Sequence, residues 1–241
     1  MSVGLAVKNA RERIEGNRYP GRGIVLGRGD DNVWIQVYWI MGRSDNSRNR
    51  IFVCEDNVVR TEAADPSKVE DPSLIIYNAM RTSGRRFVVS NGVQTDAIWA
   101  ALERDGSFAD SLSDWHHEPD APNFTPRISG YTDVEEQVLW LSILKKSPFG
   151  ENASERHFFR FDEVEVGMGY AITTYQNDGD PLPSFQGTPY LLSLPGNADE
   201  IAAHLWSKLN SDNKISLVVR SIEPTSGEVR LVVKNRYNLV Q

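Results

Sequence analysis

The chain has 241 residues, of which 40% are hydrophobic and 24% are charged, and its formal net charge at pH 7 is -7. This length accommodates one large domain or two small ones, and the composition is that of a soluble globular protein. The acidic balance argues against a duplex nucleic-acid binder, which needs a broad basic face, but not against a small phosphorylated ligand, which needs only a local cationic cluster.

Hydrophobic periodicity and turn signals in the first half of the chain predict one helix and then strands joined in hairpins. Residues 5–14 have the pattern of a short amphipathic helix. Two strands are expected at 23–27 and 33–41, on either side of a Gly29-Asp30-Asp31-Asn32 turn. Later segments continue the pattern, with strands expected at 51–54 and 57–61, apolar segments at 74–81 and 87–90, and helices at 95–102 and 108–116.

The second half of the chain repeats this style. Strands are expected at 138–144, 157–161, 168–175, 215–219 and 229–233. A helix is expected at 198–209, with Asn197 or Asp199 placed to cap it. Because strands come in hairpins and helices come in blocks, the sequence predicts an α+β protein with antiparallel sheets and helices packed outside them. We find no linker that would divide the chain, so we expect a single domain over 1–241.

The segment 38–50 runs from an apolar, aromatic strand into a polar loop that carries Arg43, Arg48 and Arg50. Three guanidinium groups this close repel one another unless an anion or water screens them. Arginine offers a planar fork of donors that matches phosphate or carboxylate oxygens. The loop is therefore a candidate site for a phosphorylated small molecule, and a solvated hairpin loop is the alternative.

Tyr77 lies at the polar edge of an apolar run. On a regular strand, Tyr77, Ala79 and Arg81 would share one face. A tyrosine and an arginine on one face can bind and protonate an anionic ligand, and a packing tyrosine is the alternative.

The segment 90–96 joins an expected strand to an expected helix. Asn91-Gly92 is a turn signal, and Thr95 and Asp96 are residue types that cap helices. A helix N-terminus with free amides also suits an anion or an amide group, although capping alone explains the segment.

Three prolines within 119–126 fix an extended path after His116, His117 and Glu118. Rigid loops rich in polar groups are common places for functional sites. Adjacent histidines cannot point the same way on a strand, and no histidine pair at helical i, i+4 spacing supports them. We therefore expect no metal site here.

Composition and motifs also bear on location and on nucleophilic catalysis. The longest apolar runs, such as 138–144, are too short to cross a bilayer, and residues 1–13 lack an apolar stretch of signal-peptide length. A single cysteine, Cys54, excludes an internal disulfide framework, and we expect it to be a small buried hydrophobe in a cytoplasmic protein. Ser2 would become a terminal nucleophile only if Met1 were removed, and it precedes an expected helix. The chain contains no Gly-x-Ser-x-Gly elbow, P-loop or GxGxxG motif.

Taken in order, several of these segments resemble the archaeal-type IMP cyclohydrolases over most of residues 19–175. The matching pieces are Tyr19-Pro20-Gly21-Arg22-Gly23-Ile24, Gly42-Arg43-Ser44 to Asn49-Arg50, Tyr77-Asn78, Val89-Ser90-Asn91-Gly92 with Thr95-Asp96, and Asn123-Phe124-Thr125-Pro126-Arg127-Ile128. The last third of the chain matches chiefly around Thr173-Thr174-Tyr175. Residues 1–18 look like an N-terminal extension.

The resemblance implies a four-layer αββα sandwich like that of N-terminal-nucleophile hydrolases, without use of a terminal nucleophile. It implies the last step of purine biosynthesis, the closure of 5-formamidoimidazole-4-carboxamide ribotide to IMP with loss of water. The implied partner is a small purine ribotide, with no metal, nucleotide or folate cofactor, no nucleic acid and no membrane. A homo-oligomer is compatible with the sequence.

The resemblance also suggests roles for particular residues. Arg50 and Tyr77 would act at the reacting formyl group, and Glu118 would move protons, with Asp120 as its substitute. Asn91 and Thr95 would orient the carboxamide and the base. The full set of expected substrate-binding residues is Arg22, Arg43, Asn91, Gly92, Thr95, Asp96 and Arg127.

Two alternatives stay open at this point. One is an amide hydrolase of the N-terminal-nucleophile type that uses Ser2 or Cys54. The other is a purine-ribotide binding module that does not catalyse a reaction.

Overall fold

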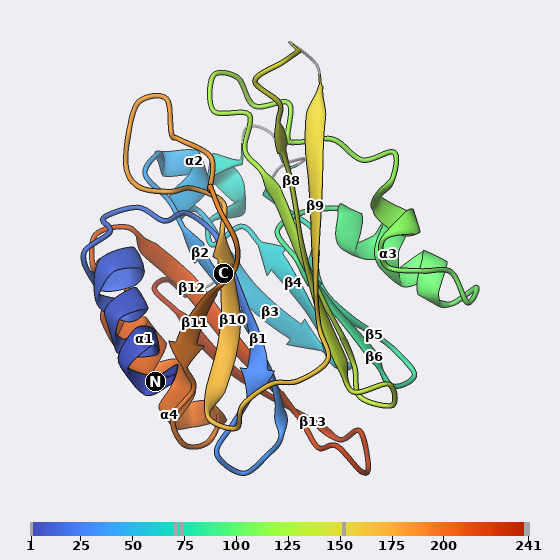
Figure 1. The fold of residues 1–241 in the computed structure, drawn as a ribbon. Helices are drawn as coiled ribbons and strands as arrows, with labels where there is room; N and C mark the ends of the chain where they lie inside the picture. Colours follow the sequence, from blue (N-terminus) through green and yellow to red (C-terminus); the bar gives the residue numbers. More distant parts are fainter. Residues whose placement is uncertain (1, 70–71, 73–74, 151–152, 239–241) are drawn as a thin grey trace.

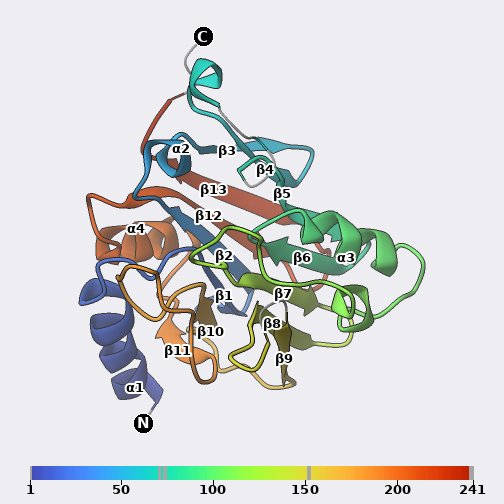
Figure 2. The same ribbon diagram turned by 90° about the horizontal axis from the view of Figure 1, so that it is seen from above.

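The computed structural model describes residues 2–69, 72, 75–150 and 153–238. Two antiparallel sheets stack face to face, and helices cover both outer faces (Figures 1 and 2). Viewed from above, α1 and α4 lie on one side of the sheets and α3 lies on the other (Figure 2). The predicted α+β class and its αββα layers are confirmed, and the likeness to N-terminal-nucleophile hydrolases stays a prediction.

The first sheet has six strands in the order β11-β10-β1-β2-β12-β13. They are β1 (Gly23–Arg28), β2 (Trp34–Met41), β10 (Met168–Thr173), β11 (Tyr190–Ser193), β12 (Lys214–Ile222) and β13 (Val229–Asn235). The predicted β1–β2 hairpin is present, and both of its strands are almost wholly buried because they lie in the middle of this sheet. The sequence did not predict β11.

The second sheet has seven strands that follow one another in chain order. They are β3 (Ile51–Glu55), β4 (Val58–Glu62), β5 (Asn78–Ser83), β6 (Arg86–Ser90), β7 (Arg127–Asp133), β8 (Val138–Lys146) and β9 (Ser154–Phe161). The strands expected in this part of the chain are confirmed. The sequence did not predict β7, and Leu74 of the expected segment 74–81 lies outside the described residues. β7 pairs with β6 and β8 and is buried along its whole length.

Helices pack on the outside of the sheets, as predicted. α1 (Ser2–Asn9) continues into the π-helix η1 (Ala10–Glu15), and α4 (Ala198–Lys208) begins after Asn197. The Asn197 side chain accepts hydrogen bonds from the backbone of Asp199 and Glu200, so Asn197 is the cap. The segment predicted as a helix at 108–116 contains only the short 3₁₀ helix η3 (Asp110–Leu112). Two other short helices are α2 (Asp45–Arg48) and η2 (Pro66–Lys68).

The expected cap residues of α3 (Gln94–Leu102) are not caps. The helix begins after Val93, whose side chain makes no capping hydrogen bond. Thr95 lies inside the first turn, and its hydroxyl donates to the Gly92 carbonyl at 3.0 Å. The capping prediction was wrong because the helix begins at Gln94, so that Thr95 and Asp96 already lie in its first turn.

The space between the two sheets is filled with apolar side chains, including Leu26 of β1 and Phe87 of β6. Arg220 of β12 lies in this core and is fully buried. It donates to the Gln36 side chain on β2 and, at 2.8 Å, to the Val88 carbonyl on β6. Arg220 therefore ties the two sheets together with neutral acceptors.

Cys54 does not match its expected burial. Burial falls along β3 from Ile51 to Glu55, and the Cys54 side chain is exposed where this strand leaves the core. No helix in the described ranges is long and apolar enough to cross a membrane.

Candidate active site

A cavity of about 360 Å³ lies at one end of the sandwich. Five segments form its wall: the segment before β1, the loop after β2, the segments before β5 and β7, and the segment after β10. These strand ends meet because neighbouring strands in the sheets are antiparallel. Several of the predicted site residues line the cavity, namely Arg22, Arg43, Arg50, Glu118 and Asp120.

Arg22 and Glu118 form a buried ion pair in this wall. The Arg22 Nη2 atom lies 2.9 Å from the Glu118 Oε2 atom, and the Glu118 side chain is only 3% exposed. A second guanidinium, that of Arg127, lies 4.0 Å from the other carboxylate oxygen. Both cations face one carboxyl group, so its charge is balanced within the protein.

The protonation of this pair follows from its surroundings. Burial raises the pKa of Glu118, and the positive charges of Arg22 and Arg127 oppose that rise. Burial alone would lower the pKa of Arg22, but the Glu118 carboxylate holds it well above its usual value. Arg22 therefore stays a cation, while Glu118 takes up a proton more readily than an exposed glutamate does.

Arg50 and Arg43 contribute to the cavity wall from the loop after β2. Arg50 is buried, and its donors reach the carbonyls of Ser47 at 2.8 Å and Met41 at 3.3 Å. No acidic side chain among the described residues forms an ion pair with Arg50. Arg43 is exposed at the rim, where it pairs with Asp178 at 2.6 Å. This wall therefore offers positive charge to a ligand.

Tyr77 lies behind the cavity rather than in its wall. Its hydroxyl oxygen is 2.6 Å from that of Tyr38 on β2, and both side chains are buried between the sheets. Arg81 points to the outer face of the second sheet, where it pairs with Asp96 and lies over the Trp99 ring. The expectation that Tyr77 and Arg81 share a face is wrong because a β-bulge between β4 and β5 interrupts the alternation.

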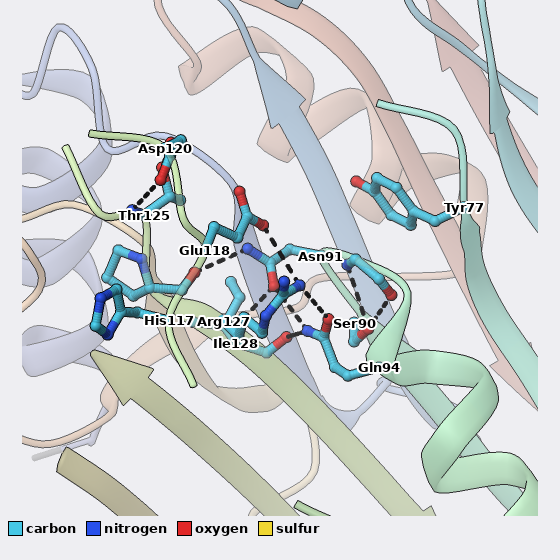
Figure 3. Close-up of polar contacts among 12 residues, drawn as sticks. Tyr77, Ser90, Asn91, Gln94, His117, Glu118, Asp120, Thr125, Arg127 and Ile128 are labelled. Carbon is cyan, nitrogen blue, oxygen red and sulfur yellow. Dashed lines mark hydrogen bonds and ion pairs between the residues drawn. The ribbon is translucent and has the colours of Figure 1, made fainter. Parts of the chain in front are cut away.

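The residues around Asn91 support the wall from behind. Asn91 Oδ1 accepts from the Ile128 backbone at 2.8 Å and from Gln94 at 3.0 Å, and Figure 3 shows this group beside Arg127. The Asn91 carbonyl accepts from Arg22 at 3.1 Å. A side chain at Gly92 would come within 2.8 Å of Arg127, so glycine leaves room for that guanidinium.

Of the other predicted substrate-binding residues, Thr95 is fully buried behind this wall. Asp96 lies on the outer face, where Asn78 and Arg81 donate to it. Neither residue lines the cavity.

The part of the sequence that forms this cavity is similar to known proteins. Residues 19–227 match a family model described as IMP cyclohydrolase-like protein. The chain belongs to this family. It is 30% identical over 190 residues to an IMP cyclohydrolase of Methanopyrus kandleri, which covers 70% of this chain and 89% of that protein. It is also 31% identical over 174 residues to an IMP cyclohydrolase of Methanothrix thermoacetophila, covering 70% of this chain and 80% of that protein.

A third IMP cyclohydrolase, from Haloquadratum walsbyi, is 26% identical over 191 residues, covering 76% of this chain and 81% of that protein. The region matched by the IMP cyclohydrolase-like family model begins at Tyr19, just after α1 and η1. All five segments of the cavity wall lie within that region.

The cavity also contains residues that the sequence analysis did not select, among them Tyr19, Thr125 and Tyr175. The rings of Tyr19 and Tyr175 stack with their centroids 6.0 Å apart. The Tyr175 hydroxyl oxygen is 2.5 Å from the Thr125 Oγ1 atom. All three residues stand in segments that resemble IMP cyclohydrolases, and this position was the available signal, because a hydroxyl side chain has no spacing pattern of its own.

The candidate nucleophiles and metal ligands lie elsewhere. Ser2 begins α1 on the outside of the first sheet, and Cys54 lies at the end of β3, so neither lines the cavity. His116 and His117 both contact the Ser154 hydroxyl, with ring nitrogens at 3.3 and 2.7 Å. Within the described ranges, no three His, Cys, Asp or Glu side chains gather in a way that would hold a metal ion.

Proposed function

We propose that this member of the IMP cyclohydrolase-like family is itself an IMP cyclohydrolase, which closes 5-formamidoimidazole-4-carboxamide ribotide to IMP with loss of water. The observation that carries the proposal is the cavity within the matched region, which Arg43, Arg50 and the buried Glu118 carboxyl group all line. A ribotide has matching ends, since it carries a phosphate dianion and a base with proton donors and acceptors.

The reaction makes defined demands on such a cavity. The carboxamide nitrogen attacks the formyl carbon, the formyl oxygen gains negative charge, and that oxygen leaves as water after taking up protons. An amide nitrogen is a poor nucleophile, so the enzyme must hold both groups in a reactive pose, and good positioning alone can lower a barrier by about 7–11 kcal/mol. A group that transfers protons and a positive group near the formyl oxygen lower the barrier further.

We assign the proton transfer to Glu118. Its carboxyl group lines the cavity, and burial raises its pKa, so it keeps a proton to higher pH than an exposed glutamate does. Arg22 holds the carboxyl group in place from behind. A protonated Glu118 would donate to the formyl oxygen as the carboxamide nitrogen attacks, and would take up the proton that this nitrogen loses. A second transfer, of the formamido N–H proton to the same oxygen, then breaks the C–O bond, releases water and leaves Glu118 protonated for the next turnover.

We propose that Arg50 stabilises the negative charge that develops on the formyl oxygen, with Tyr77 as a second hydrogen-bond donor. Arg50 supports this role because its guanidinium lines the cavity and its contacts are to carbonyl groups. Tyr77 is supported by the family resemblance, and it would act from behind the cavity wall, where its hydroxyl oxygen lies 2.6 Å from that of Tyr38. The role of Asn91, Gly92 and Arg127 would be indirect, because they hold the cavity wall in shape.

The phosphate is expected to bind at Arg43. Replacing Arg43 by alanine should raise KM for the ribotide about tenfold or more and leave kcat within about twofold, because a charge-assisted hydrogen bond contributes roughly 1.5–3 kcal/mol. Steady-state kinetics would measure both constants. Arg104→Ala is a matched control, because Arg104 is an exposed arginine that bonds within α3. An unchanged KM in Arg43→Ala would remove Arg43 from the phosphate site.

A cyclisation assay tests the function directly. Metal-stripped protein would be mixed with the formamido-ribotide, and IMP would be followed by absorbance and chromatography. IMP formation that is lost in Arg50→Ala and Tyr77→Phe would support both the reaction and these two assignments. If IMP does not form but the ribotide stabilises the fold, the binding-module alternative holds, and ligand at 100 times its Kd should add about 2.7 kcal/mol.

We further infer a single-domain cytoplasmic enzyme in which residues 1–18 are an extension. The start of the family match at residue 19 and one apolar core shared by both sheets support this organisation. No cofactor enters the proposed steps, and the metal-stripped assay tests that expectation.

A further inference from the structure

Three side chains of the cavity wall form a hydrogen-bonded chain. Both Asp120 oxygens accept from Thr125: Oδ1 from the backbone N–H at 2.6 Å, and Oδ2 from the hydroxyl group. The Thr125 Oγ1 atom lies 2.5 Å from the Tyr175 hydroxyl oxygen. Asp120, Thr125 and Tyr175 all line the cavity, so the chain runs along its wall.

The direction of this chain is fixed by the group at its end. An ionised carboxylate can only accept hydrogen bonds, so the Thr125 hydroxyl must donate its one proton to Asp120. The Thr125 oxygen must then accept the proton of Tyr175. Burial raises the pKa of Tyr175 to about 12, so this phenol keeps its proton at neutral pH. The Tyr175 oxygen can therefore still accept a hydrogen bond from a group in the cavity.

We propose that Tyr175 is a specificity-determining residue whose phenol oxygen accepts a hydrogen bond from a ring or amide N–H of the ligand, and that Asp120 sets this polarity through Thr125. The ligand's identity rests on the proposed function. There, the donor is the carboxamide nitrogen, which becomes N1 of the hypoxanthine ring and keeps one hydrogen in IMP. Adenine carries a lone pair and no hydrogen at N1. Its N1 and the Tyr175 oxygen would both be hydrogen-bond acceptors, so no hydrogen bond would form between them.

The rest of the cavity agrees with this placement of the base. Arg43 and Arg50, where a phosphate would bind, line the same cavity, and the Arg43 guanidinium lies 5.0 Å from the Tyr19 ring centroid. The Tyr19 ring stacks against Tyr175, and Leu182 lines the same cavity, so apolar surface lies beside the polar chain. A flat base with an N–H at its edge fits this combination.

The substitution Asp120→Asn tests the polarity with almost no change of shape. The asparagine oxygen can still accept from the Thr125 backbone, and its NH₂ group then faces the Thr125 hydroxyl. An NH₂ group donates, so Thr125 must turn its proton toward Tyr175, and Tyr175 must turn its proton toward the cavity. The wall would then favour an acceptor at N1.

Titration calorimetry with IMP and AMP gives the readout without turnover. We expect the unaltered protein to bind IMP more tightly than AMP and the ratio of their affinities to fall roughly tenfold or more in Asp120→Asn, since one mismatched hydrogen bond costs about that factor. Thr125→Val, which breaks the chain at nearly constant volume, should lower the ratio in the same direction. Thermal melting of each variant would confirm that it is folded.

The variant Tyr175→Phe separates action through Tyr175 from direct contact by Asp120. In the Tyr175→Phe background, adding Asp120→Asn should leave the IMP-to-AMP ratio unchanged, because the oxygen that carries the polarity is gone. A ratio that still falls in this background would mean that Asp120 contacts the base itself and would overturn the proposal.

A ratio that is unchanged by Asp120→Asn in the otherwise unaltered protein would also overturn the proposal while leaving the proposed function intact. Failure of the unaltered protein both to bind IMP and to form it would instead refute the proposed function, and with it the ligand assigned to Tyr175.

Discussion

Replacing Glu118 by glutamine is expected to lower kcat for ring closure by about 10²–10⁴-fold, the usual contribution of a positioned acid or base. Glutamine keeps the shape of the side chain and can still meet Arg22, but it cannot give and take a proton. KM should change little, because Arg43, the residue assigned to the phosphate, is untouched. Glu135→Gln is a matched control, since Glu135 is exposed in the turn after β7.

The pH dependence of kcat adds a second test of Glu118. Burial raises its pKa, so the protonated form persists to higher pH than for an ordinary glutamate. If this form donates to the formyl oxygen, kcat is highest below the raised pKa and falls as pH rises through it. The Glu118→Gln profile should lack that falling limb. A variant that keeps full turnover, or that keeps the limb, would assign the proton transfer to another group.

The parts of the fold that the sequence predicts are those set by neighbouring residues. The β1–β2 hairpin follows from two apolar runs around Gly29, and the start of α4 follows from Asn197. Short-range turn and cap chemistry determines both features, so a reader of the sequence can find them.

The parts that the sequence misses depend on distant partners. β7 is a strand because β6 and β8 flank it, although its residues Ser129, Gly130 and Thr132 have no strong strand pattern. Pairing of β12 with β2 joins residues far apart in the chain, and no local signal marks it. Arg220 is buried in the core because acceptors from both sheets surround it there.

The residues of the candidate site also fall into those that the sequence predicts and those that depend on distant contacts. Arg22, Arg50 and Glu118 were found by residue type and by family resemblance, because charged groups in loops are conspicuous. Tyr175 and Thr125 were not selected, because their importance depends on a hydrogen-bonded contact between residues 50 positions apart in the chain. Asp96 was selected as a substrate contact for its place before a helix, yet it faces the outside of the second sheet.

The second large effect is expected in stability, from replacing Arg22 by methionine. Glu118 would then lie buried without its closest cation, and breaking a buried ion pair from one side costs about 3–5 kcal/mol. Methionine fills much of the same volume, so most of the loss should come from the carboxyl group. Urea unfolding at neutral pH would measure the free energy of unfolding of both proteins.

The sign of the pH dependence distinguishes this cause from simple loss of packing. Without Arg22 the folded-state pKa of Glu118 rises further above its ordinary value of about 4.5, so the folded state binds more protons than the unfolded state between the two values. The stability of Arg22→Met should therefore be closest to that of the unaltered protein below the ordinary pKa and should fall as pH rises, until the raised pKa is passed. Adding Glu118→Gln should restore much of the loss at neutral pH, because no charge is then left unpaired. A loss that is the same at all pH values and in the double variant would show that Arg22 stabilises the fold by packing rather than by pairing with Glu118.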